Sequence, residues 1–341
     1  MKEALKRILI APAGLGTIPS VTGLADQCVA LLQHQRETWE LLRLGYESLA
    51  NVESRMFAFD GFQVTIQFNA RRITSSAAKV DEKSLRERKC FLCPDHLPDG
   101  QRGLLYRGQF LLLCNPYPIF PEHFTIPHIE HRPQEILPAL TTMLDLTEDL
   151  SPRYTVVYNG PRCGASAPDH LHLQAGTGGF MPFESEVRTM AANRRETILD
   201  TKDLSVSSFA RYYRTVIVVE SFSRDLVENA FRRIYEVYQR ISGGNEEPMM
   251  NLISMLREGR WTLAMFARSK HRPSMFYAEG EERLLVSPAA VDVSGILTLP
   301  RAEDFRRFSR DFVARIFEEV SLEEEKFAAL RAGIKQTLGT V

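Results

Sequence analysis

Residues 159–174 read NGPRCGASAPDHLHLQ, and this stretch organises the interpretation of the rest of the chain. His170, His172 and Gln174 alternate with leucines, and alternate residues of a β-strand point to the same face. Three polar side chains on one strand face are costly to bury unless each has a partner. The pattern therefore predicts a strand over residues 170–174 that carries a polar site on one face.

The segment ahead of that strand, residues 160–168, is rich in glycine and small residues. Backbone N–H groups in such a loop can hold phosphate oxygens, and an imidazole beside the loop can attack phosphorus and form a covalent intermediate. The simpler alternative is an exposed strand face with two unrelated histidines, which a bare H-x-H-x-Q pattern would favour. Cys163 is a minor candidate nucleophile, since only the histidine pair could act as its base.

The first half of the chain has the predicted order strand, strand, helix, strand, strand, which is typical of an antiparallel sheet with a helix packed on it. The strands cover residues 108–115, 123–127, 154–159 and 170–174, and the helix covers residues 133–150.

The second half repeats this theme after a predicted linker at residues 195–208. Strands are expected over residues 213–220, 249–256, 261–268, 283–287 and 295–299, and helices over residues 224–241, 302–319 and 322–338.

Ahead of both halves, apolar residues at helical spacing predict a helix over residues 24–49, and alternation predicts a strand over residues 62–68. Residues 69–103 look irregular, and so long an irregular stretch in a compact domain is usually functional or held by something.

The composition is that of an ordinary globular protein of roughly two domains. The 341 residues include 42 Lys plus Arg and 43 Asp plus Glu, for a net charge of −1, which opposes a large basic surface for duplex nucleic acid. The number of cysteines, five, is small and odd, which argues against a disulfide scaffold. The N-terminus is a poor secretory signal and no stretch approaches a spanning helix, so we expect a cytoplasmic protein without a membrane partner.

The pattern N-G-x-x-x-G-A-S-x-x-x-H-x-H-L-Q at residues 159–174 resembles the histidine-triad superfamily, in the branch of the diadenosine tetraphosphate phosphorylases, galactose-1-phosphate uridylyltransferases and GDP-galactose phosphorylases. The stretch NPYPIFPEHFTIP at residues 115–127 is similar to the same phosphorylases. The resemblance implies an α+β fold of two histidine-triad-like repeats, each an antiparallel sheet with packed helices, with further helices at both ends. It divides the chain into an N-terminal helical region (1–58), a catalytic repeat (59–200) and a catalytically inactive repeat with C-terminal helices (201–341).

The resemblance also implies roles for single residues. In that branch the second histidine of H-x-H-x-Q is the nucleophile, here His172, and the glutamine, here Gln174, holds the phosphoryl group. Ser166 matches the turn that contacts phosphate. The residues implied to lie against the nucleotide are Asn115, Asn159, Gly164, Ala165, Ser166 and Gln174, with Tyr117 near the nucleoside.

Three further features are less specific. His123, in the second resembling stretch, reads equally well as a satisfied buried histidine. Residues 67–76 (QFNARRITSS) carry two arginines beside hydroxyl groups and could bind phosphate, although a solvated strand end is the simpler interpretation. The basic cluster at residues 268–272 could meet substrate phosphates, but most such clusters are solvated edges.

Cys90 and Cys93 form a C-x-x-C pair in the irregular stretch, which fits a zinc site, a redox pair or two reduced surface cysteines. No βαβ pattern supports the redox alternative. Uridylyltransferases of the resembling branch have such a pair, then a lone histidine, then the first histidine of H-x-H. The implied zinc ligands are Cys90, Cys93, His131 and His170, and the spacing leaves His128 and His96 open as replacements for His131. Zinc would order this stretch.

The resemblance therefore implies a nucleotidyltransferase or phosphorylase that forms a nucleotidyl-histidine intermediate on His172. Its partners would be a nucleotide-sugar or dinucleotide substrate and a phosphate or sugar-phosphate acceptor, and a homodimer is compatible with it. The alternatives are a histidine-triad hydrolase with water as acceptor, a zinc-stabilised protein that binds nucleotide without turnover, and a metal-dependent enzyme. Gln174 in place of a third histidine opposes the hydrolase, and the lack of an H-E-x-x-H-type glutamate opposes the metal-dependent enzyme.

Overall fold

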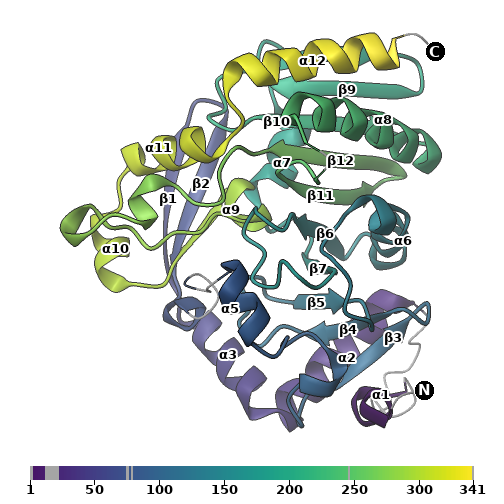
Figure 1. Cartoon of the computed structure of the whole chain (residues 1–341), viewed down its shortest axis with the longest axis vertical. Helices are drawn as coiled ribbons and strands as arrows, with labels where there is room; N and C mark the ends of the chain where they lie inside the picture. The colour runs from purple at the N-terminus through teal and green to yellow at the C-terminus, as the bar shows by residue number, and fades with distance from the viewer. Residues whose placement is uncertain (1–2, 12–22, 74–76, 78–79, 245, 340–341) are drawn as a thin grey trace.

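One ten-stranded sheet runs through the molecule and contains strands from both halves of the chain (Figure 1). The computed structural model describes residues 3–11, 23–73, 77, 80–244 and 246–339. The first half contributes β3 (Gly103–Tyr106), β4 (Phe110–Cys114), β5 (His123–Pro127), β6 (Tyr154–Asn159) and β7 (His172–Thr177). The second half contributes β8 (Arg195–Asp200), β9 (Leu204–Phe209), β10 (Val216–Ser221), β11 (Met250–Arg257) and β12 (Arg260–Ala267).

The two halves of this sheet have the same topology. From the outer edge to the centre, the order β3-β4-β5-β7-β6 corresponds to the order β8-β9-β10-β12-β11. One helix lies at the same place in each half: α6 (Leu140–Leu150) connects β5 to β6, and α8 (Arg224–Ser242) connects β10 to β11. The halves meet where β6 pairs antiparallel with β11, with Asn159 opposite Asn251. The predicted α+β fold with two repeats is confirmed.

The large sheet is covered on both faces. Helices α2 (Leu24–Thr38), α6, α8 and α12 (Glu324–Leu338) pack against one face, in a core that includes Tyr158. A smaller sheet packs against the other face, in a core that includes Val157. The neighbouring residues Val157 and Tyr158 enter different cores because successive side chains of a strand point to opposite faces.

The smaller sheet contains strands from the N-terminal and the C-terminal parts of the chain. It has the order β1-β2-β13, formed by β1 (Glu53–Phe59), β2 (Phe62–Phe68) and β13 (Ile296–Leu299). The strand predicted over residues 62–68 is confirmed, and β13 pairs with it in parallel. Residues 53–58, expected in a helical region, form a strand instead, and its mostly exposed side chains hide the alternation that would have predicted it.

Two predicted helices are each broken at one buried aromatic residue. Residues 24–49 form α2 and α3 (Glu40–Ala50), and residues 302–319 form α10 (Ala302–Arg307) and α11 (Arg310–Val320). Trp39 separates the first pair with an extended backbone, ψ 102°, and Phe308 and Ser309 separate the second pair, with ψ 131° and 170°. Both rings are buried, and the apolar periodicity continues across each break, so the pattern alone did not reveal it.

Residues 195–208, predicted as a linker, form β8 and β9 at the edge of the large sheet. Ile198 and Val206 point inward and are buried, but the charged and hydroxyl side chains around them give these strands a linker-like composition. The strand predicted over residues 283–287 is wrong, because this segment is extended but forms no strand.

Smaller shifts complete the comparison. The helix predicted from residue 133 starts only at Leu140, after a 3-10 turn. The irregular stretch contains α5 (Glu82–Glu87) and the start of β3. Residues 74–76 of the arginine-containing segment 67–76 lie outside the described residues. The remaining helices are α1 (Glu3–Ile8), α7 (Pro182–Thr189) and α9 (Ala290–Val293). Every helix in the described ranges is too short or too polar to cross a bilayer.

Candidate functional site

A cavity of about 420 Å³ lies beside the start of β7, and the predicted site residues converge on it. The wall includes the following residues that the sequence singled out: Asn115, Tyr117, Asn159, Gly164, Ser166, His172 and Gln174. Ala165 is buried between two of them and does not line the cavity. Apolar side chains such as Trp39 and Phe91 also line it. The cavity therefore combines an apolar surface with a small set of polar groups, as ligand sites commonly do.

His172 is held as a neutral imidazole with one defined tautomer. Its Nδ1 lies 2.8 Å from the carbonyl oxygen of His170. Because a carbonyl can only accept, Nδ1 carries the proton and Nε2 keeps its lone pair. Burial lowers the pKa of His172, which also favours the neutral ring. An imidazole in this state has a free nitrogen available for attack on an electrophile.

Gln134, which the sequence did not single out, fixes the backbone around that imidazole. Its Oε1 accepts from the N–H of His172 at 2.7 Å, and its Nε2 donates to the carbonyl oxygens of Asn159 at 2.9 Å and His172 at 3.0 Å. The side chain is fully buried. It thereby ties the end of β6 to the start of β7, and because it lies just before α6, the helix predicted over residues 133–150 concealed it.

Gln174 is oriented by His123. The N–H of Ile119 donates to His123 Nδ1 at 3.2 Å, so the ring proton must sit on Nε2. That Nε2 donates to Gln174 Oε1 at 2.9 Å, which leaves the Gln174 amide N–H groups free to donate. Burial lowers the pKa of His123 to about 3, so the ring is neutral. His123 is thus a satisfied buried histidine and also a positioning group for Gln174.

The loop at residues 160–168 is packed against the second half of the chain. Gly164 has φ +89°, and a Cβ there would lie 2.6 Å from the Cβ of Ala289, so both its conformation and its surroundings require glycine. Cys163 is buried in this loop, and burial raises the pKa of its thiol to about 12. A protonated thiol is a poor nucleophile, which argues against the alternative role for Cys163.

Asn159 and Arg268 connect that loop to the second half. Asn159 Oδ1 accepts from Asn251 Nδ2 at 2.9 Å and from the N–H of Ala290 at 2.7 Å. Arg268 is buried and donates to Asn251 Oδ1 and, at 3.1 Å, to the carbonyl oxygen of Pro288. Arg268 does not line the cavity, so the idea that it meets substrate is not supported. Its hydrogen bonds instead hold Asn251 and the backbone at Pro288 together.

Among the described residues that line the cavity, Arg72 and Asp292 have charged side chains. Arg72 follows the strand end, as predicted, but its side chain is half-buried and lies in the cavity wall. Asp292 was not singled out, and its carboxylate accepts from the backbone N–H groups of Ala289 at 2.9 Å and Thr298 at 3.1 Å. Burial raises the pKa of Asp292 to about 6.

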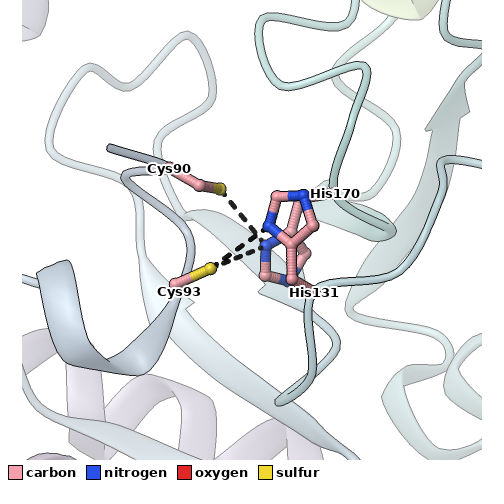
Figure 2. Close-up of side chains that lie close together, drawn as sticks. All are labelled: Cys90, Cys93, His131 and His170. Carbon is pink, nitrogen blue, oxygen red and sulfur yellow. Dashed lines mark hydrogen bonds between the residues drawn. The ribbon is translucent and has the colours of Figure 1, made fainter. Parts of the chain in front are cut away.

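A second polar cluster consists of Cys90, Cys93, His131 and His170, whose ligand atoms all lie within 4.8 Å of one another (Figure 2). His170 Nδ1 is 3.3 Å from Cys90 Sγ and 3.6 Å from Cys93 Sγ, and His131 Nδ1 is 3.3 Å from Cys93 Sγ. A tetrahedral metal with bonds of about 2.3 Å to sulfur and about 2.0 Å to nitrogen separates these atoms by about 3.5 Å. The cluster has the residues and spacing to hold a metal ion.

His170 does not share a face with His172 and Gln174, contrary to the prediction from their alternation. β7 begins only at His172, and His170 lies in the turn before it. His170 Nε2 donates to the carbonyl oxygen of His128 at 2.8 Å, which directs Nδ1 at the cysteines. The alternatives for the lone histidine lie elsewhere, because His96 Nδ1 bonds the carbonyl oxygen of Cys90 and His128 Nδ1 accepts from the N–H of Glu130.

Comparisons with known proteins cover both halves of the chain. Residues 31–177 match a family described as a domain of unknown function, DUF4922, and residues 188–341 match the family described as GDPGP1-like, C-terminal domain. No curated protein sequence is significantly similar to the chain.

Solved structures share its architecture. Yeast Ap4A phosphorylase Apa2 in complex with AMP is 19% identical, with a TM-score of 0.53 over 86% of this chain and 96% of that chain. The same enzyme in complex with Ap4A is 19% identical, with a TM-score of 0.51 over 85% and 97% of the two chains. A uridylyltransferase mutant is 10% identical over 73% and 92%, and its TM-score of 0.36 is too low to support an argument. The likeness to Apa2 shows a shared fold.

Proposed function

We propose that this chain is a member of the histidine-triad superfamily, in its transferase and phosphorylase branch, and that it transfers a nucleotidyl group through His172; the match to the GDPGP1-like C-terminal domain and the fold shared with Apa2 support this. The observation that carries the proposal is the defined tautomer of His172, with Nε2 unprotonated, in the wall of a cavity that holds the predicted nucleotide-contacting residues. We assign this chemistry to the repeat at residues 59–200 and none to the repeat at residues 201–341.

In the first step, His172 Nε2 attacks the α-phosphorus of a nucleotide-sugar or dinucleotide. A bond forms between nitrogen and phosphorus, and the bond from phosphorus to the bridging oxygen breaks, with its electron pair leaving on the departing phosphate. In the second step, an oxygen of inorganic phosphate or a sugar phosphate attacks the same phosphorus, and the P–N bond electrons return to the imidazole.

The residues around His172 are suited to stabilise this transfer. The oriented Gln174 amide and the backbone N–H groups near Gly164 and Ser166 can donate to the phosphoryl oxygens as their charge develops. Asn115 and Asn159 offer polar contacts to the nucleoside. The complexes of yeast Apa2 with AMP and Ap4A support nucleotides as the substrate class for this shared fold.

The decisive experiment incubates the protein with a panel of α-labelled nucleotide-sugars and dinucleotides and looks for an acid-labile label on His172. We expect label on the wild type and on a His34→Asn control, and none on His172→Asn. Discharge of the adduct by phosphate, by a sugar phosphate or by water alone distinguishes a phosphorylase, a transferase and a hydrolase. Absence of any adduct, together with unchanged turnover of His172→Asn, would refute the mechanism.

We further propose that the cluster of Cys90, Cys93, His131 and His170 binds zinc. Two thiolates and two imidazoles complete a tetrahedral site without an open position, which is the arrangement of structural rather than catalytic zinc. When bound, the ion would cross-link the segment before β3, through Cys90 and Cys93, to the turn before β7, through His170. Metal analysis should find one zinc per chain in the wild type and in His96→Asn, and none in Cys90→Ser. Full zinc in Cys90→Ser would show that the ligand set is wrong.

A further inference from the structure

Arg72 is a cation in the cavity wall whose guanidinium has few partners. Its Nη1 donates to the carbonyl oxygen of Tyr117 at 2.9 Å, and its buried Nε has no hydrogen-bond partner. The structure records no ion pair between Arg72 and any carboxylate of the described residues. The Arg72 side chain is half-buried, and a guanidinium held partly out of water without an ion-pair partner is unfavourable. A negatively charged group that enters the cavity from outside the chain would supply that partner.

Other polar atoms next to Arg72 are also left without partners. Thr298 Oγ1, in the cavity wall, is buried and makes no hydrogen bond, and the same is true of Gln67 Oε1 and Asn69 Oδ1 on the strand end that leads to Arg72. Thr298 lies opposite Gln67 where β13 pairs with β2. Native proteins rarely leave buried polar atoms unpaired. Gln67 and Asn69 do not line the cavity, and their unpaired atoms are acceptors, whereas the Thr298 hydroxyl is in the cavity wall and can donate to an anion there.

Asp292 does not provide the missing partner. Both of its carboxylate oxygens already accept backbone N–H groups, from Ala289 and Thr298, and these bonds hold the segment between α9 and β13 in place. The carboxylate raises the pKa of Arg72 through its charge, against the lowering caused by burial, but it makes no ion pair with it. The free N–H groups of Arg72 remain available in the same cavity as His172.

From this geometry we propose that Arg72 binds the phosphate group that is not transferred, with the Thr298 hydroxyl as a further donor. This assignment rests on the proposed nucleotidyl transfer. Because the second step attacks along the line on which the first leaving group departed, one subsite serves the leaving phosphate and then the acceptor phosphate. A guanidinium fork matches phosphate oxygens in pairs. The shared chemistry is a phosphate group, whether of inorganic phosphate or of a sugar phosphate.

The test isolates the second step. The nucleotidyl adduct is formed on wild type, Arg72→Met, Arg72→Lys and the neighbouring control Arg71→Met, freed of substrate, and discharged with increasing inorganic phosphate or a sugar 1-phosphate. For Arg72→Met we expect the half-saturating acceptor concentration to rise about tenfold or more, with partial recovery in Arg72→Lys and none of this change in Arg71→Met. Discharge by water should be the same in all four proteins. An unchanged acceptor concentration in Arg72→Met would overturn the proposal, and the more effective acceptor identifies the source of the phosphate.

A second measurement separates this proposal from the proposed function. Thermal unfolding of each protein is followed with inorganic phosphate and with potassium chloride at equal ionic strength. We expect phosphate to raise Tm in the wild type and in Arg71→Met but not in Arg72→Met. If the wild type forms no adduct, nucleotidyl transfer fails, and this measurement alone decides on Arg72. Absence of a phosphate effect in the wild type, or an equal effect in Arg72→Met, would exclude a phosphate site at Arg72.

Discussion

The two repeats of this protein have the same strand order but connect their two central strands in different ways. In the first repeat, β6 and β7 are joined by residues 160–171, a loop with glycine and serine in the cavity wall. In the second repeat, β11 and β12 are joined by a tight turn at Glu258 and Gly259, both with positive φ. The first connection contributes Gly164 and Ser166 to the cavity wall, whereas Glu258 and Gly259 do not line that cavity, so the same scaffold places the phosphate-binding candidate loop in the first repeat.

The largest expected effect tests whether chemistry is confined to the first repeat. His172→Asn should lower turnover by about a thousandfold or more, because the nucleophile of the covalent route is gone. Arg260, at the start of β12, occupies the topological position of His172 in the second repeat, and Arg260→Ala should leave turnover unchanged. Steady-state kinetics with the labelled substrate measure both. Comparable losses in the two variants would place the chemistry across both halves.

The next effect concerns stability, because the cysteine and histidine cluster belongs to the first repeat. Cys90→Ser, or removal of metal by a chelator, should lower the free energy of unfolding by about 3 kcal/mol or more, since a structural metal contributes its binding energy to folding. Denaturant unfolding with and without added zinc measures this loss. His96→Asn, nearby but outside the cluster, should keep its zinc-dependent stability. A zinc-independent unfolding curve for the wild type would remove the structural role.

Matched glycine substitutions sharpen the comparison of the two connections. Gly164→Ala forces a Cβ against Ala289 and a residue with φ +89°, so it should displace the loop and lower turnover about a hundredfold. Gly259, with φ +76°, has only Phe222 Cδ1 near a new Cβ, at 3.9 Å. Gly259→Ala should therefore cost about 1 kcal/mol of stability through backbone strain and leave turnover intact. Kinetics and unfolding on both variants give the answer, and the reverse ranking for activity would contradict it.

The smallest expected effect concerns the pH dependence of stability. Strands of the first repeat contain histidines, such as His123 in β5, and the described strands of the second repeat contain none. The pKa of His123 is lowered to about 3 by burial, so the unfolded chain binds its proton more tightly than the folded one. Stability should then fall as pH drops below about 6.5, by about 2 kcal/mol from this residue between pH 7 and pH 5. His123→Gln should flatten that dependence. Unfolding curves across this pH range measure it, and an equal slope in the variant would count against the assignment.

Local pattern was sufficient for much of the fold. Strands β2, β5 and β6 were predicted with their observed ends, since each combines alternation with clear flanking turns. Prediction failed where a residue's environment is set from far away. Trp39 interrupts a helix and packs against Gly100. The composition of β8 and β9 is that of a linker, and they are strands because β9 pairs with β10.

By itself, the sequence determined the identity of the candidate site: the alternation that carries His172 and Gln174, the glycine loop before it and the C-x-x-C pair. These are local features, set by strand geometry and by the backbone freedom of glycine. Only the tertiary structure decided that His170 turns away toward the cysteines and that Arg72 and Thr298 line the same cavity as His172. Those placements depend on packing between segments far apart in the chain, because burial and hydrogen-bond partners, and not the neighbouring residues, determine what a side chain meets.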